Sequence, residues 1–277
     1  MASAGKSKPG LRPDFATFGG IVLALLGIVG GLILEGGELA DITQVTAAMI
    51  VLGGTIGAVL IHTPLHTVTG GVKRLVNVFF EKGASAEAAV EELLGYATKA
   101  RKNGIVSLEE DAPRASDPFL VKALTLAVDG TDIQEIRKMM ELEIGIQEHH
   151  GEAEAKVFEA AGGYSPTIGI IGAVLGLIQV MKNLSDIDKV GHGIAVSFVA
   201  TVYGVAVANI VFLPAANKIK ARVQAEVQMR EMMLEGVIAI VEGLNPKLIR
   251  SKLEAYAQPH PKGSKGGAAV PAAAEGD

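Results

Sequence analysis

Phe15–Leu34, with the sequence FATFGGIVLALLGIVGGLIL, is a stretch of 20 residues that contains no charged side chain. At a rise of about 1.5 Å per residue, a helix of this length crosses a hydrocarbon core of roughly 30 Å. Three further stretches lack charged residues, and they are Ala47–Ile61, Thr167–Val180 and Ala195–Leu213. The middle two reach spanning length with their less apolar flanks, Thr43–Thr46 and Ala160–Tyr164. The sequence therefore predicts an all-α membrane protein with four transmembrane helices.

The composition combines 49% hydrophobic and 20% charged residues, with a mean hydropathy of +0.37. The charges must therefore be concentrated between and after the spans. No signal-peptide cleavage pattern precedes the first span, so we expect that span to remain as an anchor. The chain has no cysteine, which excludes disulfide and thiol chemistry. The formal net charge is -5, and no basic run favours a nucleic-acid partner.

Lysine and arginine near the ends of the spans predict the orientation, because such residues are retained on the cytoplasmic side. The connection between the first two spans carries Glu35, Glu38 and Asp41 but no basic residue. Basic residues instead precede the first span and follow the second and fourth, namely Lys6, Lys8, Arg12, Lys73, Arg74, Lys82, Lys218, Lys220 and Arg222. We expect both termini and the charged segment between the second and third spans to be cytoplasmic.

The predicted boundaries divide the chain into five segments: 1–62 with two spans, 63–162 as a cytoplasmic helical domain, 163–214 with two spans, 215–257 as cytoplasmic helices, and 258–277 as a disordered tail rich in Gly, Ala and Pro. In the second segment, Asp117 with Pro118 predicts a helix start and Gly130 its end. Thr131 with Gln134 predicts a capping box that opens a further helix. No strong breaker precedes Gly162, so this helix is expected to continue into the third span.

Small residues recur in every span at positions four apart, which predicts close helix packing within the chain or between copies of it. They are Gly27 and Gly31, Gly53 and Gly57, Gly172 and Gly176, and Ala200, Gly204 and Ala208. No acidic residue or histidine lies at mid-membrane depth, and His62 and His192 fall at span ends, where an interfacial role is the commoner case. If the chain conducts an ion, the titrating carboxylate must come from a partner.

Two hydroxyls and two prolines of the third and fourth spans are candidates for a role in such a path. Ser197 and Thr201 lie one helical turn apart, although a hydroxyl that bonds back to its own helix is the commoner case. Pro166 and Pro214 deprive the carbonyls of Gly162 and Ile210 of a helical partner, so we expect a kink or hinge at each. Ordinary kinks are the commoner alternative.

Three motifs resemble the MotA family of flagellar stator subunits, within the MotA/TolQ/ExbB proton channel family. Ser197–Pro214, SFVATVYGVAVANIVFLP, resembles the family's fourth span, Tyr164–Gly172 its third span, and Met232–Pro246 its cytoplasmic tail. The resemblance covers the chain from about Asp14 to Ala257. Ser197 is a departure, because many members have Ala there.

The resemblance implies a ring of about five copies of this subunit around two copies of a MotB-type partner, whose membrane helix bears an essential Asp. Protonation of that Asp would drive rotation of the ring. Pro166, Thr201 and Pro214 match the channel-side positions of the family, and Thr167 and Ala173 belong to the same expected lining. Sodium-driven relatives tend to carry Thr at the position of Ala173, so the resemblance favours a proton.

The stretch Ala100–Glu110, ARKNGIVSLEE, resembles the family segment that contacts the rotor's switch protein, of the FliG type. Arg101 and Glu109 match its basic and acidic positions, with Lys102 and Glu110 as supporting residues. Without the resemblance, these charges would be interpreted as a solvated surface, since exposed charges usually contribute little.

The main alternative is an energiser of the ExbB or TolQ kind, which acts on outer-membrane transport or envelope integrity. Those relatives usually have three spans, whereas this chain has four. A passive scaffold or a transporter is disfavoured because no polar substrate site lies at mid-membrane depth. The chain has no Walker loop and no nucleophile triad, and His149 with His150 is expected to face solvent, so we expect no enzymatic activity, cofactor or metal. The expected location is the bacterial inner membrane.

Overall fold

The computed structural model describes residues 12–13, 15–78, 80–81 and 86–257. The expected disordered tail, 258–277, lies outside the described residues, as do Lys6, Lys8 and Lys82. The chain divides into two compact units, which we call unit 1 (residues 1–84 and 138–230) and unit 2 (residues 85–137 and 231–277).

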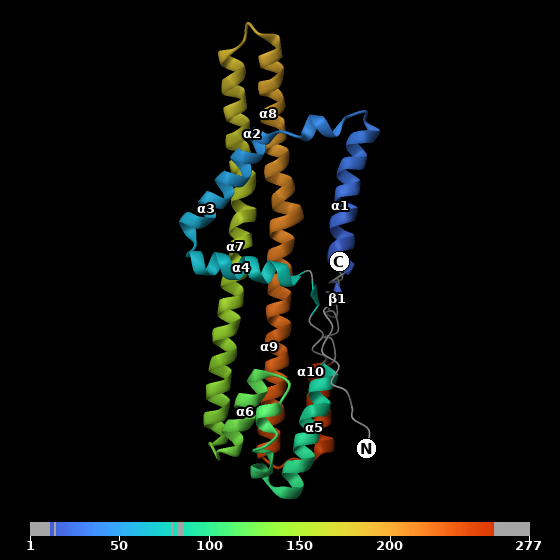
Figure 1. The fold of residues 1–277 in the computed structure, drawn as a ribbon, viewed down its shortest axis with the longest axis vertical. Helices are drawn as coiled ribbons and strands as arrows, with labels where there is room; N and C mark the ends of the chain where they lie inside the picture. Colours follow the sequence, from blue (N-terminus) through green and yellow to red (C-terminus); the bar gives the residue numbers. More distant parts are fainter. Residues whose placement is uncertain (1–11, 14, 79, 82–85, 258–277) are drawn as a thin grey trace, which may run out of the picture. The chain divides into compact units, whose positions relative to one another are not determined.

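Unit 1 contains the four apolar helical segments. The first is α1 (Phe15–Leu34), and the second combines the 3-10 turn η1 (Leu39–Ile42), α2 (Val45–Ala48), the π-helical turn η2 (Met49–Gly53) and α3 (Gly54–His62) (Figure 1). The third lies in α7 (Ile133–Lys182), and the fourth in α8 (Ile187–Ala206), the π-helical turn η5 (Val207–Phe212) and α9 (Leu213–Val241). All four are long and apolar enough to span a membrane, which confirms the predicted class.

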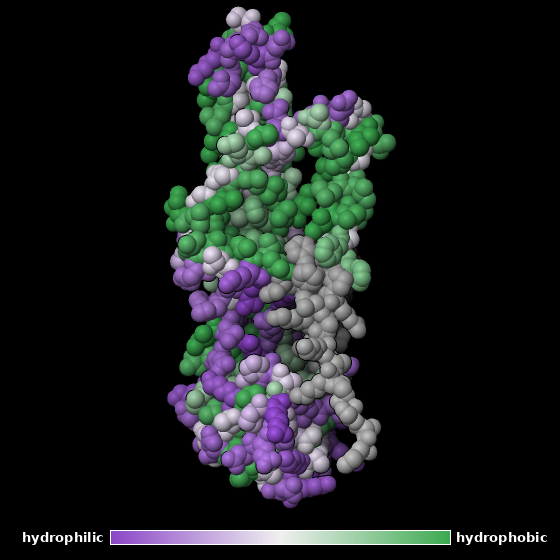
Figure 2. Space-filling view, viewed as in Figure 1, coloured by the Kyte–Doolittle hydropathy of each residue, from purple (hydrophilic) through white to green (hydrophobic). Residues whose placement is uncertain are grey.

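The apolar surface of unit 1 follows these segments. Figure 2 shows hydrophobic side chains gathered over α1 and over the segment from α2 to α3. No residue of α1 is buried in the described part of the chain, and Leu23 is 73% exposed. At Gly27, Gly31 and Gly57 an added Cβ would meet no described atom within 4 Å. The predicted packing faces of the first two spans are therefore uncovered here.

Close packing instead joins α7 to α8. A Cβ added at Gly169 would lie 2.9 Å from the carbonyl oxygen of Ala200, and one at Gly204 would lie 2.7 Å from that of Ser165. Two serines reinforce this contact: Ser165 Oγ donates to the carbonyl of Gly204 at 3.0 Å, and Ser197 Oγ lies 2.9 Å from the carbonyl of Ala173. Because the side chains at the contact are so small, the two backbones approach each other directly. We call this contact the α7–α8 seam.

The two prolines have different surroundings. Pro166 lies inside α7, which continues through it as one helix of 50 residues. Pro214 is the second residue of α9 and follows the π-helical turn η5. The kink or hinge expected at each proline stays a prediction. A π-helical turn widens the helix by one residue and accommodates the carbonyl groups that a proline leaves without a partner. The continuation of the helix from residue 133 into the third span is confirmed.

The helix that follows the second span, α4 (Leu65–Val78), packs across α7 and α9. Val68 and Leu75 of α4 contact a buried cluster that includes Phe158, Ala216 and Ile219. Arg74 pairs with Glu154 of α7 and lies 3.5 Å from a carboxylate oxygen of Glu226 on α9. A two-residue antiparallel strand pair, β1 (Arg12–Pro13) with β2 (Phe80–Glu81), was not predicted and is too short to change the fold class.

Unit 2 is a small helical domain with an aliphatic core. It contains α5 (Ala86–Asn103), the 3-10 turns η3 (Ile105–Leu108) and η4 (Ala112–Arg114), α6 (Pro118–Val128), the end of α9, and α10 (Pro246–Ala257). Its fully buried side chains include Leu93, Leu108, Leu120, Leu124, Ile238, Ile249 and Leu253. Burial would raise the pKa of Glu235, but hydrogen bonds from Arg137 and Lys252 outweigh it and lower that pKa.

The helix ends of unit 2 test the capping predictions. Asp117 caps α6 by accepting a hydrogen bond from the amide of Phe119, and Gly130, with φ of 76°, follows the end of the helix; both predictions are confirmed. The predicted capping box at Thr131 is wrong. Asp132 caps α7 instead, because its carboxylate accepts from the amide of Gln134 at 2.9 Å.

Two alanine substitutions on α7 test the seam. Gly169→Ala should lower the thermal stability of the purified protein by several degrees, because its methyl group would push the two backbones apart at a cost of about 1–3 kcal/mol. Gly163→Ala is the matched control, since a Cβ there meets no described atom within 4 Å. A thermal series followed by size-exclusion chromatography measures both, and equal midpoints would contradict the tight contact.

Candidate functional site

The candidate lining residues of the third and fourth spans lie partly together. Gly204 brings α8 against Pro166, since a Cβ on Gly204 would lie 3.2 Å from the proline Cα. Thr201 lies on the same contact, with its Cα 3.5 Å from a Cβ placed on Gly169. Pro166, Ala173 and Thr201 are half-buried, and Thr167 is exposed. The α7–α8 seam thus brings Pro166 and Thr201 together.

Pro214 has a different setting from these residues. It is exposed and lines a pocket of about 420 Å³, which it shares with Ile21 and Ala24 of α1 and with Asn209. Its neighbour Leu213, in contrast, packs against Gly162 of α7. Within the described chain, Pro214 therefore faces the α1 side and does not join Pro166 and Thr201.

The hydroxyl groups of the seam are bonded to backbone carbonyls. Thr201 Oγ1 donates to the carbonyl of Ser197 at 3.2 Å, and Thr167 Oγ1 donates to that of Tyr164 at 2.7 Å. Ser197 lies within reach of Gly193 of its own helix as well as Ala173 of α7. The commoner alternative for these hydroxyls, bonding back to a helix, is thus what the structure contains.

Two polar residues of the second and fourth spans were missed by sequence reasoning. Thr55 of α3 is 1% exposed, and its hydroxyl has no hydrogen-bond partner among the described residues. Tyr203 of α8 donates to the carbonyl of Ile42 at 2.6 Å and accepts from the amide of Gln44 at 3.2 Å, which fixes the start of the second span against α8. A lone polar side chain in an apolar span was the available signal for each.

The apolar stretches that form the seam carry no carboxylate, histidine or basic side chain. The stretches Thr167–Val180 and Ala195–Leu213 contain no Asp, Glu, His, Lys or Arg. Over the part of the chain that the structure describes, no cluster of His, Asp or Glu is placed to hold a metal ion. Proton binding at mid-membrane depth needs a carboxylate or a similar group, so the seam can pack against and orient such a group but cannot supply it.

The second candidate site is at the end of α5 in unit 2. Arg101 and Lys102 are in the last turn of α5, and Glu109 and Glu110 follow the 3-10 turn η3; all four are exposed. The chain turns between them at Gly104. Its φ of 82° is a backbone conformation that glycine adopts without strain. The four charges therefore occupy one corner of unit 2.

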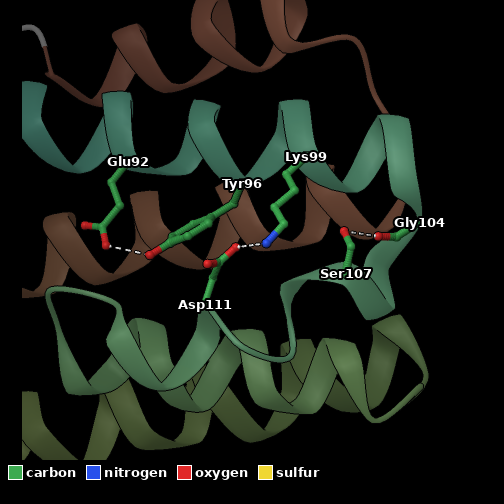
Figure 3. A network of polar contacts seen from close by, with 6 residues as sticks. All are labelled: Glu92, Tyr96, Lys99, Gly104, Ser107 and Asp111. Carbon is green, nitrogen blue, oxygen red and sulfur yellow. Dashed lines mark hydrogen bonds and ion pairs between the residues drawn. The ribbon is translucent and has the colours of Figure 1, made fainter. Parts of the chain in front are cut away.

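A network of polar contacts holds the loop from residue 105 to residue 116 against α5 (Figure 3). Glu92 accepts hydrogen bonds from the hydroxyl of Tyr96 at 2.8 Å and from the amide of Ser116 at 2.9 Å. Lys99 Nζ lies 2.5 Å from a carboxylate oxygen of Asp111, and Ser107 Oγ donates to the carbonyl of Gly104 at 2.7 Å. Leu108, fully buried, anchors the loop between these contacts.

The environment of Tyr96 in this network changes its acidity. Burial, followed by its hydrogen bond to Glu92, raises the pKa of Tyr96 above its ordinary value, so the hydroxyl remains a donor. Glu92, Tyr96 and Lys99 are spaced by four and three residues on one face of α5, a signal present in the sequence. Their partners Asp111 and Ser116, however, become apparent only in the folded unit. The network thus fixes the loop that carries Glu109 and Glu110.

Comparison with known protein families identifies the chain. The family described as the MotA/TolQ/ExbB proton channel family matches residues 111–232, and the family described as Motility protein A N-terminal matches residues 18–104. Motility protein A of Bacillus subtilis is 36% identical over 241 residues, which cover 86% of this chain and 88% of that protein. Chemotaxis protein PomA of Vibrio alginolyticus is 32% identical, over 84% of this chain and 93% of that protein. The chain belongs to the MotA/TolQ/ExbB proton channel family.

Solved structures agree with this assignment. The structure of C. jejuni MotAB matches with a TM-score of 0.85 and 30% identity, over 90% of this chain and 98% of that chain. The flagellar MotAB stator complex from Bacillus subtilis matches with a TM-score of 0.81 and 35% identity, over 88% and 96%. Within its family, the chain is therefore a MotA-like stator subunit and a multi-pass protein of the inner membrane.

Neutralising Glu92 tests the network around the loop. Glu92→Gln should raise the hydrogen-exchange rate of amides 105–116 about five-fold, because the loss of a charged acceptor costs on the order of 1 kcal/mol of local opening free energy. Glu87→Gln is the matched control, since Glu87 is exposed on the same helix. If the two variants exchange at equal rates in this loop, the network does not hold it.

Proposed function

We propose that this chain forms, with a MotB-type partner, a proton-driven stator in which a ring of its copies turns and transmits torque to the flagellar rotor. The observation that carries the proposal is the α7–α8 seam, which has the proline and threonine of the family resemblance but no carboxylate or histidine. A stator of this composition needs a second chain with a carboxylate. Two relatives have been solved as MotAB complexes, and this supports a second chain of the MotB type.

The proposed arrangement in the membrane puts both termini, segment 63–162 and segment 215–257 in the cytoplasm, with spans in 1–62 and 163–214. The distribution of Lys and Arg supports it, since Lys73 and Arg74 follow the second span and Lys218 and Lys220 begin the region after the fourth. Arg74 pairs with Glu154 of α7 and lies near Glu226 of α9, so this cation is fixed in the structure directly after the second span.

The proposed ion path runs along the seam. The partner's Asp would approach the half-buried Pro166 and Thr201 at the edge of the seam, with the exposed Thr167 and the half-buried Ala173 on the same path. Pro214 would act from the α1 side, through the π-helical turn before it. One proton crossing about 100 mV releases roughly 2.3 kcal/mol, so each ion would drive a small step.

The proposed ion is a proton because of the side chain at residue 173. Ala173 carries a methyl group, and its carbonyl lies within hydrogen-bond reach of Ser197. Alkali and alkaline-earth cations are bound in proteins by oxygen ligands, which a methyl group does not offer. Thr201 supplies a hydroxyl in either case and does not discriminate between the two ions.

Exposed apolar surface supports the proposed ring. An isolated subunit leaves all of α1 unburied, and the small-residue faces at Gly27, Gly31 and Gly57 are uncovered among the described residues. Faces of this kind promote association of helices in a membrane. The copy number of five is part of the proposal and derives from the family resemblance. An ExbB or TolQ-like energiser, the alternative considered from the sequence, is not favoured by the comparisons.

The proposed rotor contact is the exposed corner of unit 2. Arg101 and Glu109 would face a FliG-type protein, with Lys102 and Glu110 beside them. No ion pair involves any of these four residues within the described parts of the chain, so their charges are available to a partner. The network around Glu92 and Lys99 supports this role, because a rigid loop transmits force with less loss than a mobile one.

The role of the seam is tested by motility in strains whose chromosomal copy carries Thr201→Val or Pro166→Ala. We expect normal membrane levels and normal co-purification of the partner, with flagella that are built but do not turn, because the fold tolerates each change while the ion path does not. Thr201→Ser, which keeps the hydroxyl, should preserve swimming. Unimpaired swimming of the Val and Ala strains would contradict the proposed path.

The rotor contact is tested by charge reversal. Arg101→Glu should reduce motor torque several-fold without changing membrane assembly, and Glu109→Arg in the same chain should restore part of it if both residues face one rotor surface. Lys247→Glu, an equivalent reversal at an exposed site of unit 2, is the control and should leave torque unchanged. Bead rotation assays measure the torque. Wild-type torque in the Arg101→Glu strain would refute the contact.

A further inference from the structure

A second pocket of unit 1 has no part in the proposed ion path. It has a volume of about 610 Å³ and lies between the second span, α7 and α8. Its lining comes from Thr46 and Ile50, from the last two turns of α7, and from the first three turns of α8. These are the helix ends remote from α4 (Figure 1). In the membrane arrangement proposed above, on which this inference rests, this end of the spans is where the hydrocarbon core meets the head groups.

The side chains that line the pocket change from basic near the loop between α7 and α8 to apolar further along these helices. Lys182, Lys189 and His192 lie near the loop between α7 and α8, whereas Leu175 and Val196 lie one to two turns deeper, together with Ile50. At 5.4 Å per helical turn, the change falls within roughly 10 Å. Leu175 is 44% exposed, so the apolar half is open toward the surface of the unit.

The two lysines at the rim are matched in number by two carboxylates of the same loop, but only the lysines line the pocket. Lys189 Nζ lies 3.0 Å from a carboxylate oxygen of Asp186, so one cation is compensated. Lys182 is exposed, and no ion pair involves it among the described residues. Asp188, the other carboxylate of this loop, is exposed and does not line the pocket. The rim thus retains a positive charge at Lys182, next to a histidine.

We propose that this pocket binds an anionic phospholipid, with its phosphate on Lys182 and His192 and one acyl chain along Ile50, Leu175 and Val196. The order of charge and apolar surface in the pocket is that of a phospholipid at the membrane boundary. Lysine side chains at span ends extend to the head groups with their aliphatic stems along the apolar surface. A bound chain would also cover the apolar surface between the second span and the seam.

The apolar half of the pocket distinguishes a lipid from a soluble anion. Inorganic phosphate gains nothing from Ile50 or Val196, because burial of apolar surface requires an apolar ligand. A second copy of the chain or a segment of the partner is the other possible occupant, and either would fill the pocket with protein side chains. The experiment described next distinguishes these occupants from a lipid.

The experiment uses the stator complex purified in detergent and native mass spectrometry. It is titrated with phosphatidylglycerol, with phosphatidylcholine of the same acyl chains, and with inorganic phosphate. Phosphatidylglycerol should bind saturably and more tightly than phosphatidylcholine. Lys182→Gln should weaken its binding about five-fold, since a lysine near anionic lipid contributes roughly 1 kcal/mol. Thr46→Phe should weaken it by filling the pocket, and Lys73→Gln, the control at the α4 end, should not.

Three results would overturn the proposal. The first is equal binding of the two lipids, or equal losses for the Lys182 and Lys73 variants, which would indicate nonspecific attraction. The second is displacement of the lipid by inorganic phosphate alone, which would indicate a soluble-anion site. The third is a structure of the assembled complex in which protein side chains fill the pocket. Co-purification of the partner with each variant shows that a loss of binding is not a loss of fold.

Discussion

Direct contact between the backbones of α7 and α8 is the constraint on which unit 1 depends. Gly169 and Gly204 leave no room for a side chain, and Ser165 and Ser197 are engaged with carbonyl groups across the contact. In lipid, such close approach and interhelical hydrogen bonding replace the hydrophobic drive that holds soluble helices together. The same constraint excludes a bulky or charged residue from the seam. For the proposed stator, the contact between α7 and α8 thus carries no charge of its own where a partner's carboxylate would act.

Unit 2 is stabilised by an aliphatic core and by ion pairs, in contrast to the backbone contact of unit 1. These interactions suit the proposed contact with the rotor. An aliphatic core of Leu93, Leu120, Ile238 and Leu253 provides its stability in water. The ion pairs of Glu235 with Arg137 and Lys252, and of Lys99 with Asp111, fix helix ends and a loop without contributing to that core. A firmly held corner with exposed charges is what a surface needs if it is to push on another protein, and the proposed rotor contact relies on it.

The sequence predicted the features of the fold that depend on composition and on helical periodicity. The bounds of α1 match the uncharged stretch residue by residue, and the continuous helix into the third span followed from the absence of a breaker. The cap at Asp132 was assigned one residue too early, because Thr131 and Asp132 are both good caps and local geometry decides between them. Glu92 and Tyr203 were missed because their partners Ser116 and Ile42 are distant in the chain. The burial of Thr55 was missed because it depends on how the helices pack together.

The central claim is that the α7–α8 seam faces a partner helix, and disulfide cross-linking tests it most directly. The chain has no cysteine, so single cysteines introduce no background. Thr201→Cys should cross-link to a cysteine placed beside the partner's Asp, whereas Leu23→Cys, on the uncovered surface of α1, should not. Cross-links formed by Leu23→Cys and absent from Thr201→Cys would contradict the account.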